Sequence, residues 1–279
     1  MKEIIKVEGV SFYYNYGKED QVLALDDISL NINKGEFITV LGHNGSGKST
    51  LARLLNALLI PNKGKVIVDG LMTTQTDNLW PIRQTVGMVF QNPDNQIVAT
   101  TVEEDVAFGP ENLGIPSHTI RERVDEALKL IGIYHLRQRP PHHLSGGQKQ
   151  KLAIAGVVAM RPRCLILDEP TALLDPEGRR EVMATVKKLN REEKITIIYI
   201  THFMEEAIIS DRIMVMDQGR FVMEGTPKGV FSRTEKLREL GLDVPQVTEL
   251  AQILRKDGIH LPLDTLEIEE LVMSLCSSK

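Results

Sequence analysis

The chain has 279 residues, of which 42% are hydrophobic and 25% are charged, as in a globular protein that buries a substantial core in one or two domains. A formal net charge of -5 excludes a strongly basic surface, so nucleic acid is not an expected partner. The two cysteines exclude a disulfide framework, the N-terminus lacks a signal-peptide pattern, and the apolar runs are too short to cross a bilayer.

The N-terminal part of the chain alternates β-rich stretches with one helix. From Ser49 the pattern "STLARLLNALL" places leucines at helical spacing, directly after a glycine-rich loop. The apolar alternation before and after this helix is typical of strands. The predicted strands are residues 4–10, 25–32, 36–41, 66–69 and 86–90.

The middle of the chain changes to helix-forming patterns. Thr101 and Glu104 form a predicted capping box, and Thr119 with Glu122 predicts a second one. The second helix has one apolar face, formed by Ile120, Val124, Ala127 and Ile131. Apolar strands return in "CLILDE", "ITIIYITH" and "RIMVMDQG", which are separated by helical segments.

Buried strands that alternate with helices predict an α/β fold with a mainly parallel sheet and an inserted α-helical subdomain at about residues 93–160. After about residue 225 the strands stop and short helical patterns follow, with Gly241 and Gly258 closing two of them. We therefore predict one domain over residues 1–225 and a small C-terminal helical region over residues 226–279.

The first glycine cluster fits the phosphate-loop pattern GxxxxGK[ST] between a strand and a helix. Backbone N–H groups and the positive helix end bind phosphate in such a loop, Lys48 neutralises the β- and γ-phosphates, and Ser49 binds Mg²⁺. The alternative is a tight glycine turn without a ligand. The predicted nucleotide-binding residues are Gly42, His43, Asn44, Gly45, Ser46, Gly47, Lys48, Ser49 and Thr50.

Two acidic residues follow the apolar strand "CLILDE". Asp168 is expected to support Mg²⁺, and Glu169 to polarise the water that attacks the γ-phosphate. Most such acidic pairs are merely solvated strand ends, so the prediction depends on the phosphate loop elsewhere in the chain. Together the two motifs predict a P-loop NTPase that uses ATP and Mg²⁺.

A second small-residue turn, "LSGGQ", leads into the helical pattern "QKQKLAIAGVV". Ser145, Gly146, Gly147 and Gln148 are therefore candidates for a second anion-binding helix start. The plain alternative is an ordinary capped helix. Nothing in the turn alone decides between the two interpretations.

The motifs follow one another as "GHNGSGKST", "VFQNP", "LSGGQ", "LILDEP", "TALLDP" and "YITH". This order resembles the ATP-binding cassette (ABC) ATPases over residues 1 to about 225. The resemblance implies an ABC-type nucleotide-binding domain, in which the LSGGQ signature of one subunit closes over ATP held by the phosphate loop of another. We therefore expect an ATPase that works as a dimer.

The resemblance also implies roles for single residues. Gln91 matches the glutamine that contacts Mg²⁺ and the attacking water, and His202 matches the histidine that touches the γ-phosphate. Asp175 matches the aspartate of the loop through which the subunits communicate. Ala172 departs from the serine that is frequent in the family, which puts one hydrogen bond across the interface in doubt.

An aromatic residue near the N-terminus is expected to stack on adenine. Tyr14 is our choice because it precedes the first core strands at a suitable distance, with Tyr13 and Tyr16 as alternatives. Alternation of side chains along a strand does not decide among the three.

The stretch "VFQNPDNQIVATTVEEDVAFGPENLG" is similar to the energy-coupling factor transporter ATPases, and "QNPDNQ" to the first of their two types. The resemblance implies a peripheral protein on the cytoplasmic face of the membrane that powers uptake of vitamins or transition-metal ions. Its implied partners are a second ABC ATPase subunit, either a paralogue or itself, an integral membrane T component and a substrate-binding S component. The alternatives are the ATPase of a conventional ABC importer or exporter and a nucleotide-gated switch protein.

Overall fold

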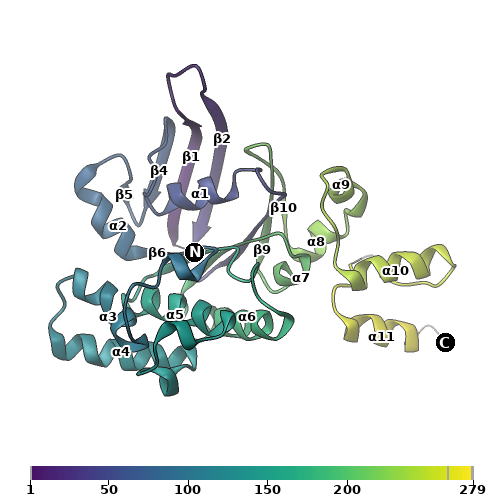
Figure 1. The fold of residues 1–279 in the computed structure, drawn as a ribbon. Helices are drawn as coiled ribbons and strands as arrows, with labels where there is room; N and C mark the ends of the chain where they lie inside the picture. The colour runs from purple at the N-terminus through teal and green to yellow at the C-terminus, as the bar shows by residue number, and fades with distance from the viewer. Residues whose placement is uncertain (1, 263, 278–279) are drawn as a thin grey trace.

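The computed structural model describes residues 2–262 and 264–277, and its strands form two sheets (Figure 1). The six-stranded sheet has the order β10-β9-β3-β8-β7-β6, and all neighbours are parallel except β10 and β9. This arrangement confirms the predicted α/β class with a mainly parallel sheet. Its strands are β3 (Phe37–Leu41), β6 (Val86–Val89), β7 (Cys164–Asp168), β8 (Thr196–Thr201), β9 (Arg212–Asp217) and β10 (Arg220–Gly225).

The N-terminal strands form a second, antiparallel sheet of order β2-β1-β4-β5, which the sequence analysis did not separate from the first. Helix α1 (Lys48–Leu55) buries leucines in a core shared by both sheets. The strands of this sheet are β1 (Glu3–Tyr14), β2 (Val22–Asn33), β4 (Lys63–Val68) and β5 (Leu71–Met72).

A group of helices packs below the parallel sheet in Figure 1, around a second core. The capping box of Thr101 and Glu104 is present, but the one predicted at Thr119 is wrong. Pro116, with φ of -58°, is the N-cap in place of Thr119, so the helix starts three residues earlier than predicted, at Ser117. The helices of this group are α3 (Val102–Asn112), α4 (Ser117–Ile131), α5 (Gly146–Ala159) and α6 (Pro176–Arg191).

The C-terminal helices lie to the right in Figure 1, on the opposite side of the molecule from α3 and α4. Val230, Phe231 and Leu237 join β9 in a third core, whereas Ala251 and Leu271 belong to a small separate cluster. The elements are α7 (Met204–Ala207), α8 (Pro227–Phe231), α9 (Thr234–Glu239), α10 (Gln246–Lys256) and α11 (Ile268–Ser277).

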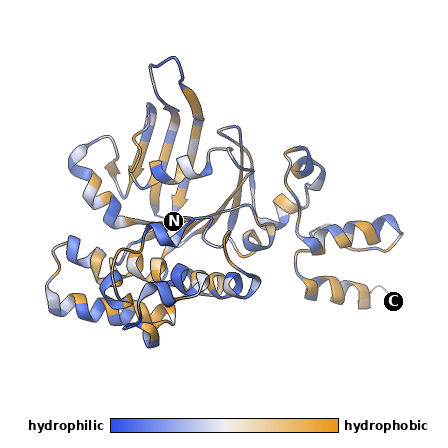
Figure 2. Cartoon of the chain, in the orientation of Figure 1, coloured by the Kyte–Doolittle hydropathy of each residue, from blue (hydrophilic) through white to orange (hydrophobic). Residues whose placement is uncertain are grey.

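Short helices complete the connections, and the distribution of hydropathy follows the layers. Figure 2 shows hydrophobic residues along the central strands and mixed residues along the surrounding helices. Within residues 2–262 and 264–277, no helix is both long enough and apolar enough to span a bilayer. The short elements are α2 (Leu79–Thr85) and the 3-10 helices Thr76–Asn78, Pro93–Asn95, Tyr134–Leu136 and Pro141–His143.

Candidate functional site

The phosphate loop runs from the end of β3 to the start of α1, in a backbone conformation that favours glycine. Gly45 and Gly47 have φ of 84° and 104°, in the left-handed region. A Cβ atom at Gly47 would lie 2.7 Å from the carbonyl oxygen of Ala24, and one at Gly42 would lie 2.4 Å from that of Met216. The loop therefore runs against neighbouring backbone, with its own N–H groups near the positive end of α1.

Lys48 occupies the centre of this loop and is only 4% exposed. Its Nζ atom donates hydrogen bonds to the carbonyl oxygens of Gly42 at 2.8 Å and His43 at 2.9 Å, and lies 3.8 Å from Oε1 of Glu169. Burial lowers the pKa of Lys48, and the negative charges of Glu169 and Asp168 partly offset that shift. The structure thus places a desolvated cation where an anionic ligand would meet it.

The two acidic residues lie at the end of β7, which is buried along its whole length. Asp168 accepts a hydrogen bond from the Ser49 hydroxyl at 3.0 Å, so the end of β7 contacts the start of α1. Burial raises the pKa of Asp168, the Ser49 hydrogen bond opposes this shift, and the charge of Glu169 adds to it. A cation beside Ser49 would remove much of the cost of keeping Asp168 ionised.

Glu169 contacts the two other predicted catalytic residues, Gln91 and His202. The Gln91 Nε2 atom donates to Oε2 of Glu169 at 3.2 Å, and Nδ1 of His202 lies 3.3 Å from the same oxygen. The backbone of Glu169 has φ of 49°, a left-handed conformation that costs about 1–3 kcal/mol in a non-glycine residue. Its N–H donates to the Ile200 carbonyl oxygen at 2.9 Å, which attaches the strained residue to β8.

One pocket, with a volume of about 630 Å³, joins the phosphate loop to these catalytic residues. Gly42, His43, Ser46 and Asp168 of the predicted set are not part of its lining. Val22, Leu23, Ala24 and Leu173 were missed, because an apolar residue in a strand or turn carries no motif. The lining residues are Tyr14, Val22, Leu23, Ala24, Asn44, Gly45, Gly47, Lys48, Ser49, Thr50, Gln91, Glu169, Ala172, Leu173 and His202.

An aromatic and aliphatic wall closes one side of this pocket. The Tyr14 hydroxyl lies 3.1 Å from the Thr50 hydroxyl, so the ring stands beside the start of α1. The ring of Tyr13 instead pairs with the ring of Tyr16, at a centroid distance of 5.6 Å, and neither lines the pocket. This geometry favours Tyr14 over the two alternatives as the adenine contact.

The LSGGQ turn lies outside the pocket lining. Ser145 caps α5 by accepting a hydrogen bond from the backbone N–H of Gln148, and the Gln148 side chain accepts from the N–H of Ser145. The ordinary capped helix of the sequence analysis is therefore present. Ser145 and Gly146 are nevertheless exposed, so the helix start is open to a ligand or a second chain.

Asp175 also has a structural role that the motif did not reveal. Its Oδ1 atom accepts a hydrogen bond from the Gly178 N–H at 2.8 Å and caps α6, with Pro176 in the first turn. The pair Asp-Pro is itself a signal for a helix start. Gly147 packs against Gly178, where an added Cβ atom would lie 3.2 Å from the Gly178 Cα. The signature turn and the Asp175 loop therefore form one surface.

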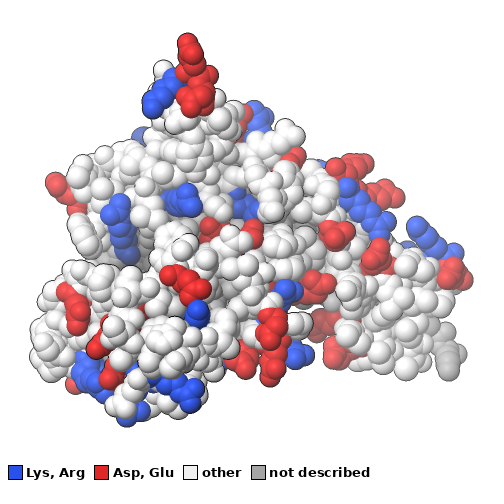
Figure 3. Space-filling model, viewed as in Figure 1, with Lys and Arg blue, Asp and Glu red and all other residues white. Residues whose placement is uncertain are grey.

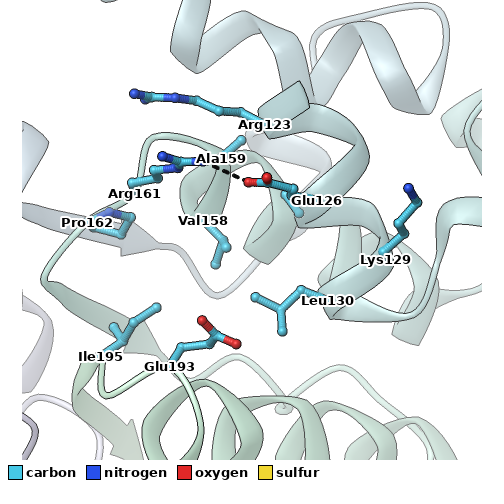
Figure 4. A pocket seen from close by; sticks show the side chains of 11 residues that line it. Arg123, Glu126, Lys129, Leu130, Val158, Ala159, Arg161, Pro162, Glu193 and Ile195 are labelled. Carbon is cyan, nitrogen blue, oxygen red and sulfur yellow. Dashed lines mark hydrogen bonds and ion pairs between the residues drawn. The ribbon is translucent and has the colours of Figure 1, made fainter. Parts of the chain in front are cut away.

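A second hollow of about 600 Å³ lies between α4, the end of α5 and the segment before β8 (Figure 4). Arg161 and Glu126 form an ion pair at 2.8 Å across its rim, and Glu193 projects from its other side. It contains none of the predicted site residues. Size alone does not distinguish the two hollows, but of these two the first combines the buried Lys48 with Glu169 at a strand end.

The donor atoms of the predicted Mg²⁺ residues suit the ion. Ser49, Gln91 and Asp168 supply hydroxyl, amide and carboxylate oxygens, the hard donors that Mg²⁺ prefers, and Mg²⁺ commonly adds substrate phosphates to one or two protein ligands. Ser49 and Asp168 are already in contact, and Gln91 reaches the same cluster through Glu169. These residues fit the ion.

Charge on the face drawn in Figure 3 does not mark another site of this kind. Figure 3 shows side chains of both signs scattered over the face in view, with acidic ones at the tip of the β1–β2 hairpin. The net charge of -5 is therefore distributed rather than gathered into one field on that face.

Comparison with known proteins agrees with this geometry. The model of the ABC transporter family matches residues 25–172. The energy-coupling factor transporter ATP-binding protein EcfA1 of Caldanaerobacter subterraneus is 60% identical over 99% of this chain and 100% of the relative. The protein of the same name from Clostridioides difficile is 58% identical over 99% of each chain.

Solved structures give the same result for the fold. The structure of cbiO1 from Clostridium perfringens, described as part of the ABC transporter complex cbiONQ, has a TM-score of 0.78 and 41% identity, and covers 91% of this chain and 100% of that one. The ATP-binding cassette MJ0796, solved as a dimer with ADP and Pi, has a TM-score of 0.72 and 33% identity over 80% of this chain and 99% of that one. The chain belongs to the ABC transporter family, among the energy-coupling factor transporter ATP-binding proteins.

Proposed function

We propose that the chain is the ATP-hydrolysing subunit of an energy-coupling factor importer and powers uptake of a vitamin or a transition-metal ion. The observation that carries the ATPase part is the convergence of Lys48, Gln91, Glu169 and His202 on one pocket. The transporter class is supported by curated relatives that carry the energy-coupling factor name and match over nearly their whole length.

The nucleotide binds with its phosphates against the phosphate loop and its base beside Tyr14. The loop N–H groups and the positive end of α1 stabilise the phosphate charge, and Lys48 exchanges its bonds with loop carbonyls for bonds with phosphate oxygens. Val22 and Leu23 are 58% and 45% exposed, and the base covers them from water when it stacks on Tyr14.

Ser49, Gln91 and Asp168 would hold Mg²⁺. When bound, the ion supplies charge neutralisation at the β- and γ-phosphates. Asp168 supports it from the buried end of β7, where the neighbouring Ser49 hydroxyl fixes its orientation. The cation also favours the ionised form of a carboxyl whose pKa is raised by burial.

Hydrolysis transfers the γ-phosphoryl group to water. Glu169 accepts a proton from the attacking water, and the oxygen of that water bonds to the γ-phosphorus. The bond from this phosphorus to the bridging oxygen of ADP breaks. Gln91 and His202 both contact Oε2 of the Glu169 carboxylate. His202 also contacts the γ-phosphate when ATP is bound. The remaining acceleration comes from positioning and from charge stabilisation.

A second ATPase subunit, a paralogue or another copy, completes the site. The start of α5, with Ser145 and Gly146 exposed and Gly147 and Gln148 half-buried, closes over nucleotide in the partner, and Asp175 lies at the same interface. The ATPase pair binds an integral membrane T component and works with a substrate-binding S component. We place the chain peripherally, on the cytoplasmic face of the membrane.

The predicted domain boundaries separate the nucleotide-binding part of the chain from its C-terminal helices. Residues 1–225 are assigned to the nucleotide-binding domain, with a helical subdomain at about residues 93–160 that carries the signature. Residues 226–279 are assigned to the C-terminal region. The support is that α10 and α11 pack around their own small apolar cluster, apart from the nucleotide pocket.

Replacement of the proposed base tests this function most directly. Glu169→Gln keeps the size and the hydrogen-bonding capacity of the side chain but removes its ability to take a proton. In the assembled transporter we expect ATP turnover to fall by about 100-fold or more, within the range of general-base catalysis. Binding of a fluorescent ATP analogue should remain within about threefold of wild type, because the phosphate loop is unchanged.

The matched control is Glu193→Gln, the same chemical change in the second hollow (Figure 4). It should leave both turnover and binding unaltered. Wild-type turnover in Glu169→Gln would refute the assignment of the base. Turnover in the absence of any co-purifying membrane component would leave the ATPase intact but remove support for the transporter.

A further inference from the structure

One buried carboxylate outside the pocket lining, that of Glu206, belongs to none of the motifs. Glu206 is on the short helix α7, is 3% exposed, and does not line the pocket. A carboxylate that is removed from water is costly unless its oxygens are satisfied by hydrogen bonds or by charge. Its partners therefore indicate what the residue does.

The two carboxylate oxygens of Glu206 each bind a different segment of the chain, the turn after β7 and the end of β8. Oε1 accepts a hydrogen bond from the Thr171 hydroxyl at 2.5 Å, and Oε2 accepts one from the Thr201 hydroxyl at 2.6 Å. Thr171 stands two residues after Glu169, and Thr201 directly precedes His202. One side chain thus connects the segments that carry the proposed base and the proposed γ-phosphate contact.

Both threonines are themselves fixed on their other side. The Thr201 hydroxyl accepts a hydrogen bond from the Phe203 N–H at 3.0 Å, which turns the chain immediately around His202. The Tyr199 hydroxyl lies 3.4 Å from that of Thr171. Burial raises the pKa of Tyr199 well above its ordinary value, with a further increase from the charge of Glu206, so the phenol stays a neutral donor.

One cation accompanies this buried carboxylate. Nε of Arg179 lies 3.7 Å from Oε1 of Glu206, and the Arg179 guanidinium stands over the Phe203 ring at 3.7 Å from its centroid. The same arginine thus contacts the carboxylate and the residue that follows His202. The charged groups and the hydroxyls form one connected network around the two segments.

We propose that Glu206 is a positioning residue for ATP hydrolysis, which holds Glu169 and His202 in register through Thr171 and Thr201. The inference rests on the proposed roles of Glu169 and His202. Glu169 and His202 contact each other at 3.3 Å, at the rim of the pocket, and that contact depends on the relative position of two separate segments. A carboxylate suits this task because it only accepts hydrogen bonds and so binds both hydroxyls in the same sense.

Glu206→Gln in the assembled transporter tests this proposal. The amide keeps the shape of the side chain but replaces one acceptor oxygen by a donor, so one of the two threonine hydroxyls can no longer donate to it. We expect kcat to fall by about tenfold or more while the KM for ATP changes by less than about threefold, because only the alignment for the chemical step is disturbed.

Substitutions at Thr171 make the test independent of the stability of Glu206 variants. Thr171→Val keeps the shape and removes the hydroxyl, so kcat should fall as in Glu206→Gln. Thr171→Ser keeps the hydroxyl and should restore kcat to within about threefold of wild type. The double variant Glu206→Gln, Thr171→Val should lose less kcat than the product of the two single losses, because both substitutions act on one connected network.

Several outcomes would overturn the proposal. Folded Glu206→Gln and Thr171→Val proteins with kcat within twofold of wild type would do so, as would a Thr171→Ser variant as slow as Thr171→Val. A loss of thermal stability with unchanged kcat would show that the network only supports the fold. Glu169→Gln in the same assay distinguishes failure of the proposed function from failure of this inference. If Glu169→Gln retains turnover, the proposed function fails. If Glu169→Gln is inactive while Glu206→Gln is active, only this inference fails.

Discussion

The phosphate loop and the signature turn both place small residues at the start of a helix, yet they differ in charge and burial. The phosphate loop contains the buried Lys48, with Asp168 and Glu169 close by. The signature turn is exposed, and Ser145 and Gln148 cap their own helix. The first region therefore carries counter-charge and the proposed catalytic groups in one chain, while the second offers neutral backbone donors to an external ligand. Mutations should consequently separate ATP binding from turnover.

The largest expected effect is on the phosphate loop. Lys48→Ala removes the one lysine or arginine among the described residues that line the pocket, together with two hydrogen bonds to loop carbonyls. ATP affinity should fall by about 10- to 100-fold, as expected for loss of a charged hydrogen bond, and turnover should fall with it. Equilibrium binding of a fluorescent ATP analogue measures the change.

Lys63→Ala is the matched control, because this exposed lysine lies on β4 and outside the pocket. It should bind ATP as wild type does. Unchanged ATP affinity in Lys48→Ala would contradict the view that the phosphate loop supplies the counter-charge.

A smaller effect is expected at the signature turn. Ser145→Ala removes the helix cap and the exposed hydroxyl, with a stability loss of about 1 kcal/mol. ATP binding to the isolated chain should stay unchanged, whereas turnover of the assembled transporter should fall by about tenfold, because the helix start acts on nucleotide in the partner.

Thr101→Ala sharpens this test, since Thr101 forms the same kind of capping box at the start of α3. Both variants should lose similar stability in thermal unfolding, but only Ser145→Ala should lose turnover. If Thr101→Ala loses as much turnover, the effect arises from helix stability and the comparison between the two turns breaks down.

The smallest effect concerns His43, within the phosphate loop. Its Nδ1 lies 2.7 Å from the Asn44 carbonyl oxygen and its Nε2 lies 2.7 Å from Oδ1 of Asp217. The backbone bond and then the Asp217 bond raise the pKa of His43 above 6.5. Because the pKa of His43 is higher in the folded than in the unfolded state, it stabilises the fold fully at a pH below the unfolded-state pKa. This stability is lost as the pH rises through the folded-state pKa.

Asp217→Asn should therefore lower the pKa of His43, as measured by NMR titration of its ring protons. At about pH 6 the variant should be less stable than wild type, by less than about 1 kcal/mol because the ring is largely exposed. The difference in stability should shrink as the pH rises. Glu19→Gln removes the same charge from the hairpin and should leave the pKa of His43 unchanged. A deficit that grows with pH would reverse the assigned sign.

Motifs that are contiguous in the sequence could be recognised from the sequence alone. The residues from Gly42 to Thr50, the acids that follow the β7 strand, and the LSGGQ turn each depend on local backbone geometry, which neighbouring residues determine. The antiparallel N-terminal sheet was not separated, because alternation reveals which face is buried but not which strand is paired. The start of α4 was misplaced because Pro116 begins the helix where no side-chain cap exists.

Several parts of the site required the folded chain. The choice of Tyr14 over Tyr13 and Tyr16 follows from how β1 crosses the start of α1. Val22 and Leu23 reach the pocket only because β2 pairs with β1. These residues belong to no motif, because they line the pocket only through the position of their strand beside β1.

By itself, the sequence determined the nucleotide chemistry of this protein, the family and the order of its motifs, because phosphate binding needs particular residue types at fixed spacing. Tertiary structure alone decided how Gln91, Glu169 and His202 converge, and that Glu206 connects the segments of the latter two through Thr171 and Thr201. The physical reason is that hydrogen bonds between distant segments depend on the register of β6, β7 and β8, which residue identity along the chain does not encode locally.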